Sequence, residues 1–89
     1  MHQAHLIISG KVHGVFYRAS CQKVAQELTL TGWVRNLPRG EVEVLAQGEK
    51  EKIEKLIEWC KKGPPSANVS GVKLEWGDIV KELLEFEIT

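Results

Sequence analysis

One short tract near the N-terminus combines residue types that suit the binding of an oxyanion. Residues 10–18 read GKVHGVFYR, between an apolar strand-like run and a run with helical periodicity. A turn between Gly10 and Gly14 can direct several backbone N–H groups at one point, and a helix start adds its positive dipole end. Arg18 adds a guanidinium there. The tract therefore favours a phosphate-like ligand, and an ordinary loop with a surface arginine is the alternative.

A second group of useful chemistry lies at Arg35 and Asn36, near the end of a predicted strand. If the first and second strands run parallel with the third between them, their C-terminal ends meet at one edge of the sheet. One of the two side chains can then reach the mouth of the anion-binding loop. Asn36 is the more interesting candidate, because an amide donates and accepts together and can hold a water in one orientation. A simple turn residue is the alternative.

The spacing of apolar residues predicts two helices, at residues 18–28 and 49–62. Each carries one apolar stripe at positions i, i+3, i+4 and i+7. The stripes are Cys21, Val24, Ala25 and Leu28 in the first helix, and Ile53, Leu56, Ile57 and Cys60 in the second. A single stripe on each helix means that both can cover the same face of a sheet.

Five strands complete the predicted order of elements. They are His5–Lys11, Trp33–Leu37, Glu41–Gln47, Val72–Trp76 and Leu84–Ile88. The second strand is taken to begin after Gly32, which we place with the residues that end the first helix. The order predicts the α+β class, as a ferredoxin-like split βαβ sandwich with two helices on one face of a mainly antiparallel sheet.

Length and charge set further limits. We expect one domain over residues 1–89, and 12 basic against 12 acidic residues give a net charge of zero. That balance argues against a protein whose main task is to grip nucleic acid or an acidic membrane. No apolar run has the length of a membrane span. A ferredoxin-like RNA-binding domain would need aromatic residues on the exposed face of its central strands and a basic surface, but residues 41–47 of the third strand contain no aromatic residue and the net charge is zero. We expect a cytoplasmic monomer.

The cysteines and histidines do not form a recognisable site. Cys21 and Cys60 are far apart in sequence and are expected to fill the core, with a disulfide between them as the alternative. The three histidines, His2, His5 and His13, lack the spacing of metal ligands. No metal site is therefore predicted.

Two segments resemble the signatures of the acylphosphatase family. Gly10–Arg18 is similar to the first signature, and Gly32–Val42 followed by Gly48 is similar to the second. Order, spacing and length also agree, so the resemblance covers essentially the whole chain. It implies hydrolysis of a small acyl phosphate to a carboxylate and inorganic phosphate, without a metal or cofactor. A non-catalytic module that binds phosphate or carbamoyl phosphate is the alternative.

The resemblance also implies roles for particular residues. Arg18 matches the phosphate-binding arginine of the family, and Asn36 matches the asparagine that positions the attacking water. The substrate-binding residues that it implies are His13, Gly14, Val15, Phe16, Tyr17 and Arg18. His13 stands where glutamine is usual and Tyr17 where phenylalanine is commoner. Neither change removes a backbone donor, so we expect both to be compatible with activity.

Overall fold

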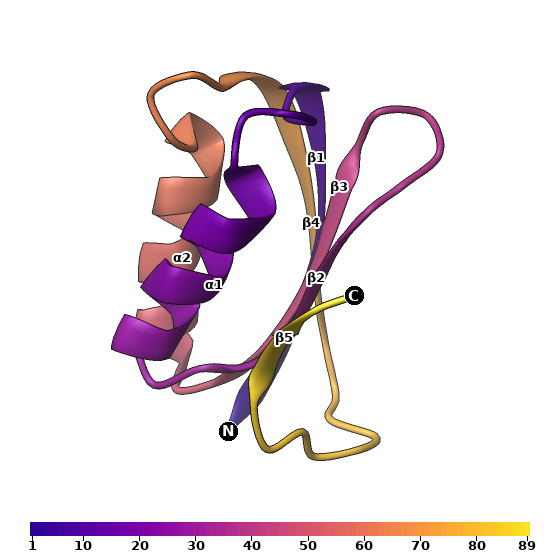
Figure 1. Cartoon of the computed structure of the whole chain (residues 1–89). Helices are drawn as coiled ribbons and strands as arrows, with labels where there is room; N and C mark the ends of the chain where they lie inside the picture. Colours follow the sequence, from indigo (N-terminus) through magenta and orange to yellow (C-terminus); the bar gives the residue numbers. More distant parts are fainter.

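A computed structural model describes residues 1–89. Its elements, shown in Figure 1, are β1 (His2–Lys11), α1 (Tyr17–Glu27), β2 (Thr31–Asn36), β3 (Val42–Gly48), α2 (Lys50–Lys62), β4 (Asn68–Gly77) and β5 (Phe86–Ile88). Both helices lie on one face of the sheet, which leaves the other face open (Figure 1). The predicted α+β, ferredoxin-like sandwich is confirmed. Neither helix is long and apolar enough to cross a membrane.

The sheet has the strand order β4-β1-β3-β2-β5. β3 pairs antiparallel with both β1 and β2, so β1 and β2 run parallel and their C-terminal ends lie at the same edge. β4 pairs antiparallel with β1, and the short β5 pairs parallel with β2. The loop after β1 and the end of β2 therefore meet, as the sequence predicts.

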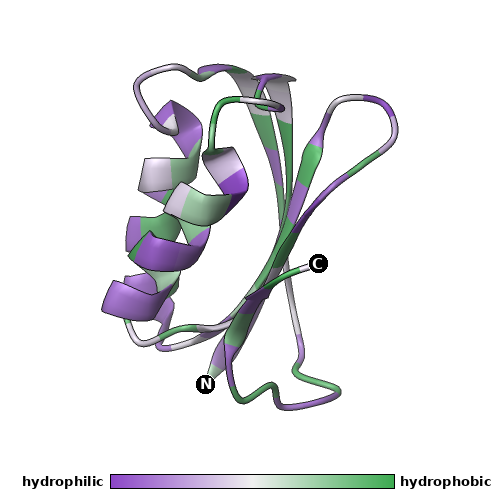
Figure 2. Cartoon of the chain, in the orientation of Figure 1, coloured by the Kyte–Doolittle hydropathy of each residue, from purple (hydrophilic) through white to green (hydrophobic).

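The core lies between the sheet and the two helices. Alternate residues of the central strands are fully buried, and Figure 2 shows hydrophobic stretches along these strands. Their cross-strand partners are in register: Val44 of β3 lies opposite Leu6 of β1 on one side and opposite Val34 of β2 on the other. The helices contribute the predicted stripes, including Cys21 and Cys60, which are buried free thiols. Contact with Cys60, together with burial, raises the pKa of Cys21, so the two stripes meet at these residues.

Several element boundaries differ from the prediction. β1 begins at His2 rather than His5, and β4 covers Asn68–Gly77 rather than Val72–Trp76. Both strands are longer than predicted because their backbone pairing continues beyond the residues that alternate between apolar and polar. Gly32 lies inside β2, which spans Thr31–Asn36 rather than Trp33–Leu37. A Cβ atom at Gly32 would lie 1.8 Å from the carbonyl oxygen of Leu45, so close strand packing, not helix termination, explains this glycine.

The remaining differences are small shifts at element ends. The first helix is Tyr17–Glu27 instead of 18–28, and the second begins at Lys50 instead of 49, with Glu49 as its N-cap. β3 begins at Val42 instead of Glu41, and β5 at Phe86 instead of Leu84. End residues make few of the periodic contacts on which the prediction rests, so such shifts are expected.

The C-terminus of α1 is closed by a left-handed residue that is not glycine. Thr29 has φ 56°, the N–H of Thr29 donates to Gln26 and the N–H of Leu30 donates to Ala25. These two bonds form a Schellman motif, in which glycine usually occupies the left-handed position. A β-branched residue in this conformation is strained by about 1–2 kcal/mol. Thr29 therefore carries local strain that the helix end holds in place.

We expect Thr29→Gly to stabilise the protein by about 0.5–1 kcal/mol, since glycine removes the strain but loses more backbone entropy on folding. Urea denaturation, compared through the transition midpoint at an unchanged slope, measures the gain. Ser20→Gly is the control, because Ser20 lies within α1 and does not have a positive φ. That variant should lose stability, and a loss in both variants would show that Thr29 is not strained.

Candidate anion-binding site

The loop between β1 and α1 presents unpaired backbone donors. Gly14 and Phe16 both have left-handed backbones, with φ 69° and 63°, and flank Val15. Such alternation turns successive N–H groups toward one side and forms an anion-binding nest. No N–H group of residues 13–19 donates to an acceptor within the chain, and the first N–H of this region to do so is that of Ser20, to Phe16. The donors are therefore free for a ligand.

The start of α1 lacks the groups that usually satisfy a helix N-terminus. Its N-cap residue, Phe16, makes no side-chain capping bond, and its first turn contains no acidic residue. By contrast, α2 carries Glu51 in its first turn and Lys61 and Lys62 in its last turn, as its dipole favours. The positive end of the α1 dipole is thus left without a counter-charge at the loop.

Arg18 and Asn36 line the same pocket as this loop. The pocket has a volume of about 280 Å³ and is lined by Val12, Gly14, Phe16, Tyr17, Arg18, Ala19, Asn36 and Ile88. Arg18 is half-buried and belongs to none of the ion pairs of the chain. The Oδ1 atom of Asn36 is buried and has no hydrogen-bond partner. A buried polar atom without a partner is uncommon, and here it belongs to a residue that lines the same pocket as Arg18.

Strand geometry separates Arg35 from Asn36. Asn36 has the same orientation as the buried Val34 and lies on the face of β2 toward α1. Arg35 lies on the open face, where its Nε donates to Glu43 Oε1 at 2.5 Å. His5 Nε2 contacts the other carboxylate oxygen at 2.6 Å. Of the two candidates at the end of the second strand, only Asn36 is therefore near the loop.

Two of the predicted site residues do not line the pocket. The His13 ring is held by a hydrogen bond from Nε2 to the carbonyl oxygen of Glu41 at 2.8 Å, so Nε2 carries a proton. This bond ties the loop to the connection between β2 and β3. Val15 is buried in the core. Only the backbone N–H groups of His13 and Val15, and not their side chains, are therefore available to a ligand.

Tyr17 anchors the loop to the second helix. Its hydroxyl donates to the carbonyl oxygen of Cys60 at 2.7 Å, and its ring lies 5.2 Å from that of Trp59. Burial, together with the neighbouring Cys60, raises the pKa of Tyr17, so the hydroxyl stays protonated. The bond also satisfies a carbonyl in the last turn of α2, which has no partner within its own helix. The phenolic oxygen therefore has a structural use that phenylalanine cannot supply.

Sequence reasoning missed three residues that line the pocket, namely Val12, Ala19 and Ile88. Val12 and Ala19 flank the predicted site residues 13–18 in sequence, and this adjacency could have identified them. Ile88 lies on β5, opposite Val34 in the parallel pairing. Only the position of the last strand beside β2 brings it to the site, and the sequence does not specify that pairing. No group of three or more His, Cys, Asp or Glu side chains is arranged to hold a metal ion.

The geometry defines a class of protein: an α+β sandwich with unpaired backbone donors at its first strand-to-helix loop. Comparison with known proteins identifies the family, because the acylphosphatase family model matches residues 4–88. An acylphosphatase of Methylococcus capsulatus is 46% identical over 88 residues, 99% of this chain and 96% of the relative. The crystal structure of an acylphosphatase from Bacillus subtilis matches with a TM-score of 0.97 and 31% identity, covering 100% of this chain and 99% of that one.

The chain also matches part of a larger protein. The crystal structure of full-length HypF in a phosphate- and nucleotide-bound form aligns with a TM-score of 0.84 and 29% identity. That alignment covers all of this chain but 12% of HypF. Taken together, the family model and the full-length relatives show that this chain belongs to the acylphosphatase family. The prediction of an acylphosphatase enzyme is confirmed.

The ion cluster of His5, Arg35 and Glu43 on the open face of the sheet predicts how the stability of the protein depends on pH. Partial burial of Glu43 opposes its charge, but hydrogen bonds from His5 and Arg35 and their charges outweigh burial and lower its pKa below the ordinary 4.5. A carboxyl whose pKa is lower in the folded state stabilises the protein above its unfolded pKa, and that stability is lost as the pH falls through the folded value.

We therefore expect Glu43→Gln to be less stable than wild type near pH 6, by about 1 kcal/mol because the cluster is partly exposed to solvent. The difference should shrink as the pH falls toward 3. Urea denaturation at a series of pH values measures it, with Glu54→Gln as the control, because Glu54 on α2 is exposed and belongs to no ion pair. A difference that does not depend on pH would contradict the assignment.

Proposed function

We propose that the chain hydrolyses acyl phosphates at the pocket between the β1–α1 loop and the end of β2. One observation supports the proposal: the residues that carry a free guanidinium, unpaired backbone N–H groups and an unpartnered amide oxygen line one pocket. The first two bind an oxyanion, and the third accepts a hydrogen bond from a polar molecule beside it. This combination suits a phosphoryl group with a water next to it.

Arg18 and the loop donors bind the phosphoryl oxygens. Phosphoryl transfer passes through a loose transition state with negative charge on the equatorial oxygens. Donors that are fixed before the reaction stabilise this charge without reorganisation, and removal of one such donor typically lowers the rate by about 10²–10³. The left-handed backbones at Gly14 and Phe16 and the anchors at His13 and Tyr17 keep these donors in place.

Asn36 positions the water. Its Oδ1 accepts a hydrogen bond from one O–H of the water, which orients the oxygen lone pair toward phosphorus. The water oxygen forms a bond to phosphorus as the bond from phosphorus to the acyl oxygen breaks, and the carboxylate leaves with the electron pair. A carboxylate is a weak base, so no general acid is needed. The proton of the attacking water passes to a non-bridging phosphoryl oxygen, because an amide cannot act as a base.

We expect Arg18→Ala to abolish measurable hydrolysis of benzoyl phosphate, because it removes the charge that stabilises the transition state. Release of inorganic phosphate, measured with excess chelator, tests this. Arg35→Ala is the matched control, since it also removes one arginine but from the open face of β2. Wild-type turnover in Arg18→Ala would show that the site lies elsewhere. Phosphate binding by a folded wild type without turnover would favour the alternative, a non-catalytic binding module.

Asn36→Ala should lower kcat by at least about 10², while the inhibition constant for inorganic phosphate changes less than threefold. The reason is that Asn36 acts on the water and not on the phosphoryl group. Asn68→Ala, an exposed asparagine on β4, is the control. If Asn36→Ala instead weakens phosphate binding as much as it lowers kcat, the asparagine binds phosphate and does not position water.

A further inference from the structure

Phe16 combines backbone strain with exposure of its ring. Its φ of 63° is a conformation that bulky side chains rarely adopt. The side chain is 81% exposed and makes no contribution to the core. Glycine would satisfy the backbone at this position without strain, and a polar residue would suit the exposure. Strained residues tend to occur where a ligand is held, and Phe16 lines the proposed catalytic pocket.

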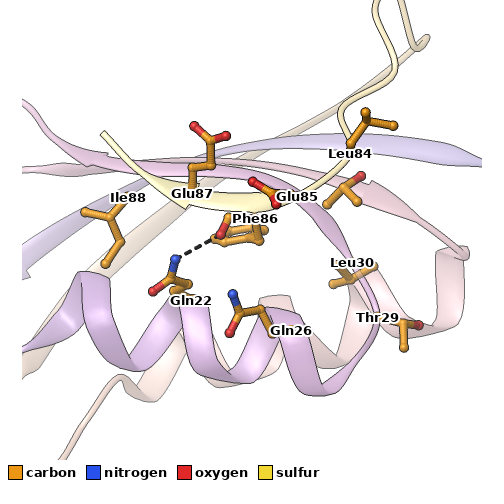
Figure 3. Close-up of a pocket in the computed structure, with 10 residues that line it drawn as sticks. Gln22, Gln26, Thr29, Leu30, Leu84, Glu85, Phe86, Glu87 and Ile88 are labelled. Carbon is orange, nitrogen blue, oxygen red and sulfur yellow. Dashed lines mark hydrogen bonds between the residues drawn. The ribbon is translucent and has the colours of Figure 1, made fainter.

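Ile88 gives the same pocket a second apolar wall. It lies on β5, and it is 40% exposed although its strand neighbour Phe86 is buried. Figure 3 shows Ile88 over α1, on the side of Gln22 away from Gln26, which is the side of the helix N-terminus. Gln22 Nε2 donates to the carbonyl oxygen of Phe86 at 2.9 Å, which ties β5 to α1. This bond keeps Ile88 close to the start of the helix.

The charges of the pocket are distributed unevenly. Arg18 is the one charged residue among those that line it, and the proposed function assigns this charge to the phosphoryl group. A second negative charge on the acyl group would therefore meet no cation there. The space of about 280 Å³ is several times the roughly 30 Å³ that one water occupies, so a phosphoryl group, a water and several carbon atoms fit together.

From these observations we infer that Phe16 and Ile88 form a subsite for the acyl group, and that this subsite selects uncharged apolar or aromatic acyl groups. The inference rests on the proposed function, because it takes the phosphoryl group to lie at Arg18. An aromatic acyl group stacks on or meets the edge of the Phe16 ring, and Ile88 covers its other side. Neither side chain takes part in the chemical step, so both act on specificity.

Binding of two phosphonates tests the subsite without turnover. Wild type should bind benzylphosphonate about five- to tenfold more tightly than methylphosphonate, measured by calorimetry. Phe16→Ala and Ile88→Ala should each reduce this ratio by about threefold or more. Because the Phe16 backbone belongs to the anion-binding loop, the ratio of the two ligands is the readout, not the affinity for either one. A ratio near one in wild type overturns the inference.

Controls separate a subsite from a general loss of structure. Val80→Ala removes apolar surface from a side chain that is 95% exposed and does not line the pocket, and it should leave the ratio unchanged. A subsite variant that has merely lost its fold would lose affinity for both phosphonates and for inorganic phosphate. An unchanged ratio in both Phe16→Ala and Ile88→Ala, with binding intact, also overturns the inference.

Kinetics then distinguish this inference from the proposed function. With benzoyl and acetyl phosphate as substrates, the ratio of the two KM values is the readout: in both variants the KM for benzoyl phosphate should rise relative to the KM for acetyl phosphate, since the contact is made in ground and transition states alike. If both substrates are hydrolysed but the variants do not change the ratio of their KM values, the subsite is rejected and the proposed function stands. Absence of hydrolysis in wild type rejects the proposed function, while the phosphonate ratio still decides whether the subsite exists.

Discussion

The uncapped start of α1 is the constraint on which the site depends. A helix leaves its first N–H groups without intrahelical partners, and most helices satisfy them with a side chain at the N-cap. Here the N-cap is Phe16, which supplies no side-chain acceptor, and the loop before it adds further free N–H groups. Exposed donors without partners are acceptable only where water or a ligand can reach them. The fold therefore has to place this helix start at an open pocket.

The rest of the fold meets that requirement through contacts on three sides of the loop. His13 bonds to the backbone at Glu41, and Tyr17 bonds to the end of α2. The register of the β1–β4 pairing shifts between Ser9 and Gly10, just before β1 ends; Gly10 has φ 120°, and a Cβ atom there would lie 2.2 Å from the carbonyl oxygen of Asn68. The strain at Phe16 persists because these contacts leave the loop no alternative path.

The sequence predicts the parts of this arrangement that depend on local pattern. Periodicity identifies both helices and the order of elements along the chain, and the split βαβ arrangement that this order predicts places β1 and β2 parallel, which brings Arg18 and Asn36 to one edge. It does not predict features that depend on contacts distant in sequence. The pairing that makes Gly32 a strand residue and the position of Ile88 beside the loop both depend on which strands become neighbours. Phe16 and Thr29 have left-handed backbones, which bulky and β-branched residues rarely adopt. Conformational propensity alone would therefore have predicted a negative φ at both positions.

β2 shows why neighbouring residues can have unrelated tasks. Successive strand side chains point to opposite faces, so Arg35 joins the ion cluster with Glu43 while Asn36 faces the pocket. A neutral amide suits that second position better than a carboxylate would. A carboxylate could accept a proton from water, but its charge would oppose the negative phosphoryl group and weaken the binding that we propose for Arg18. Since the leaving carboxylate needs no proton, the proposed mechanism asks only that this residue orient the water, and an amide oxygen can do so without added charge.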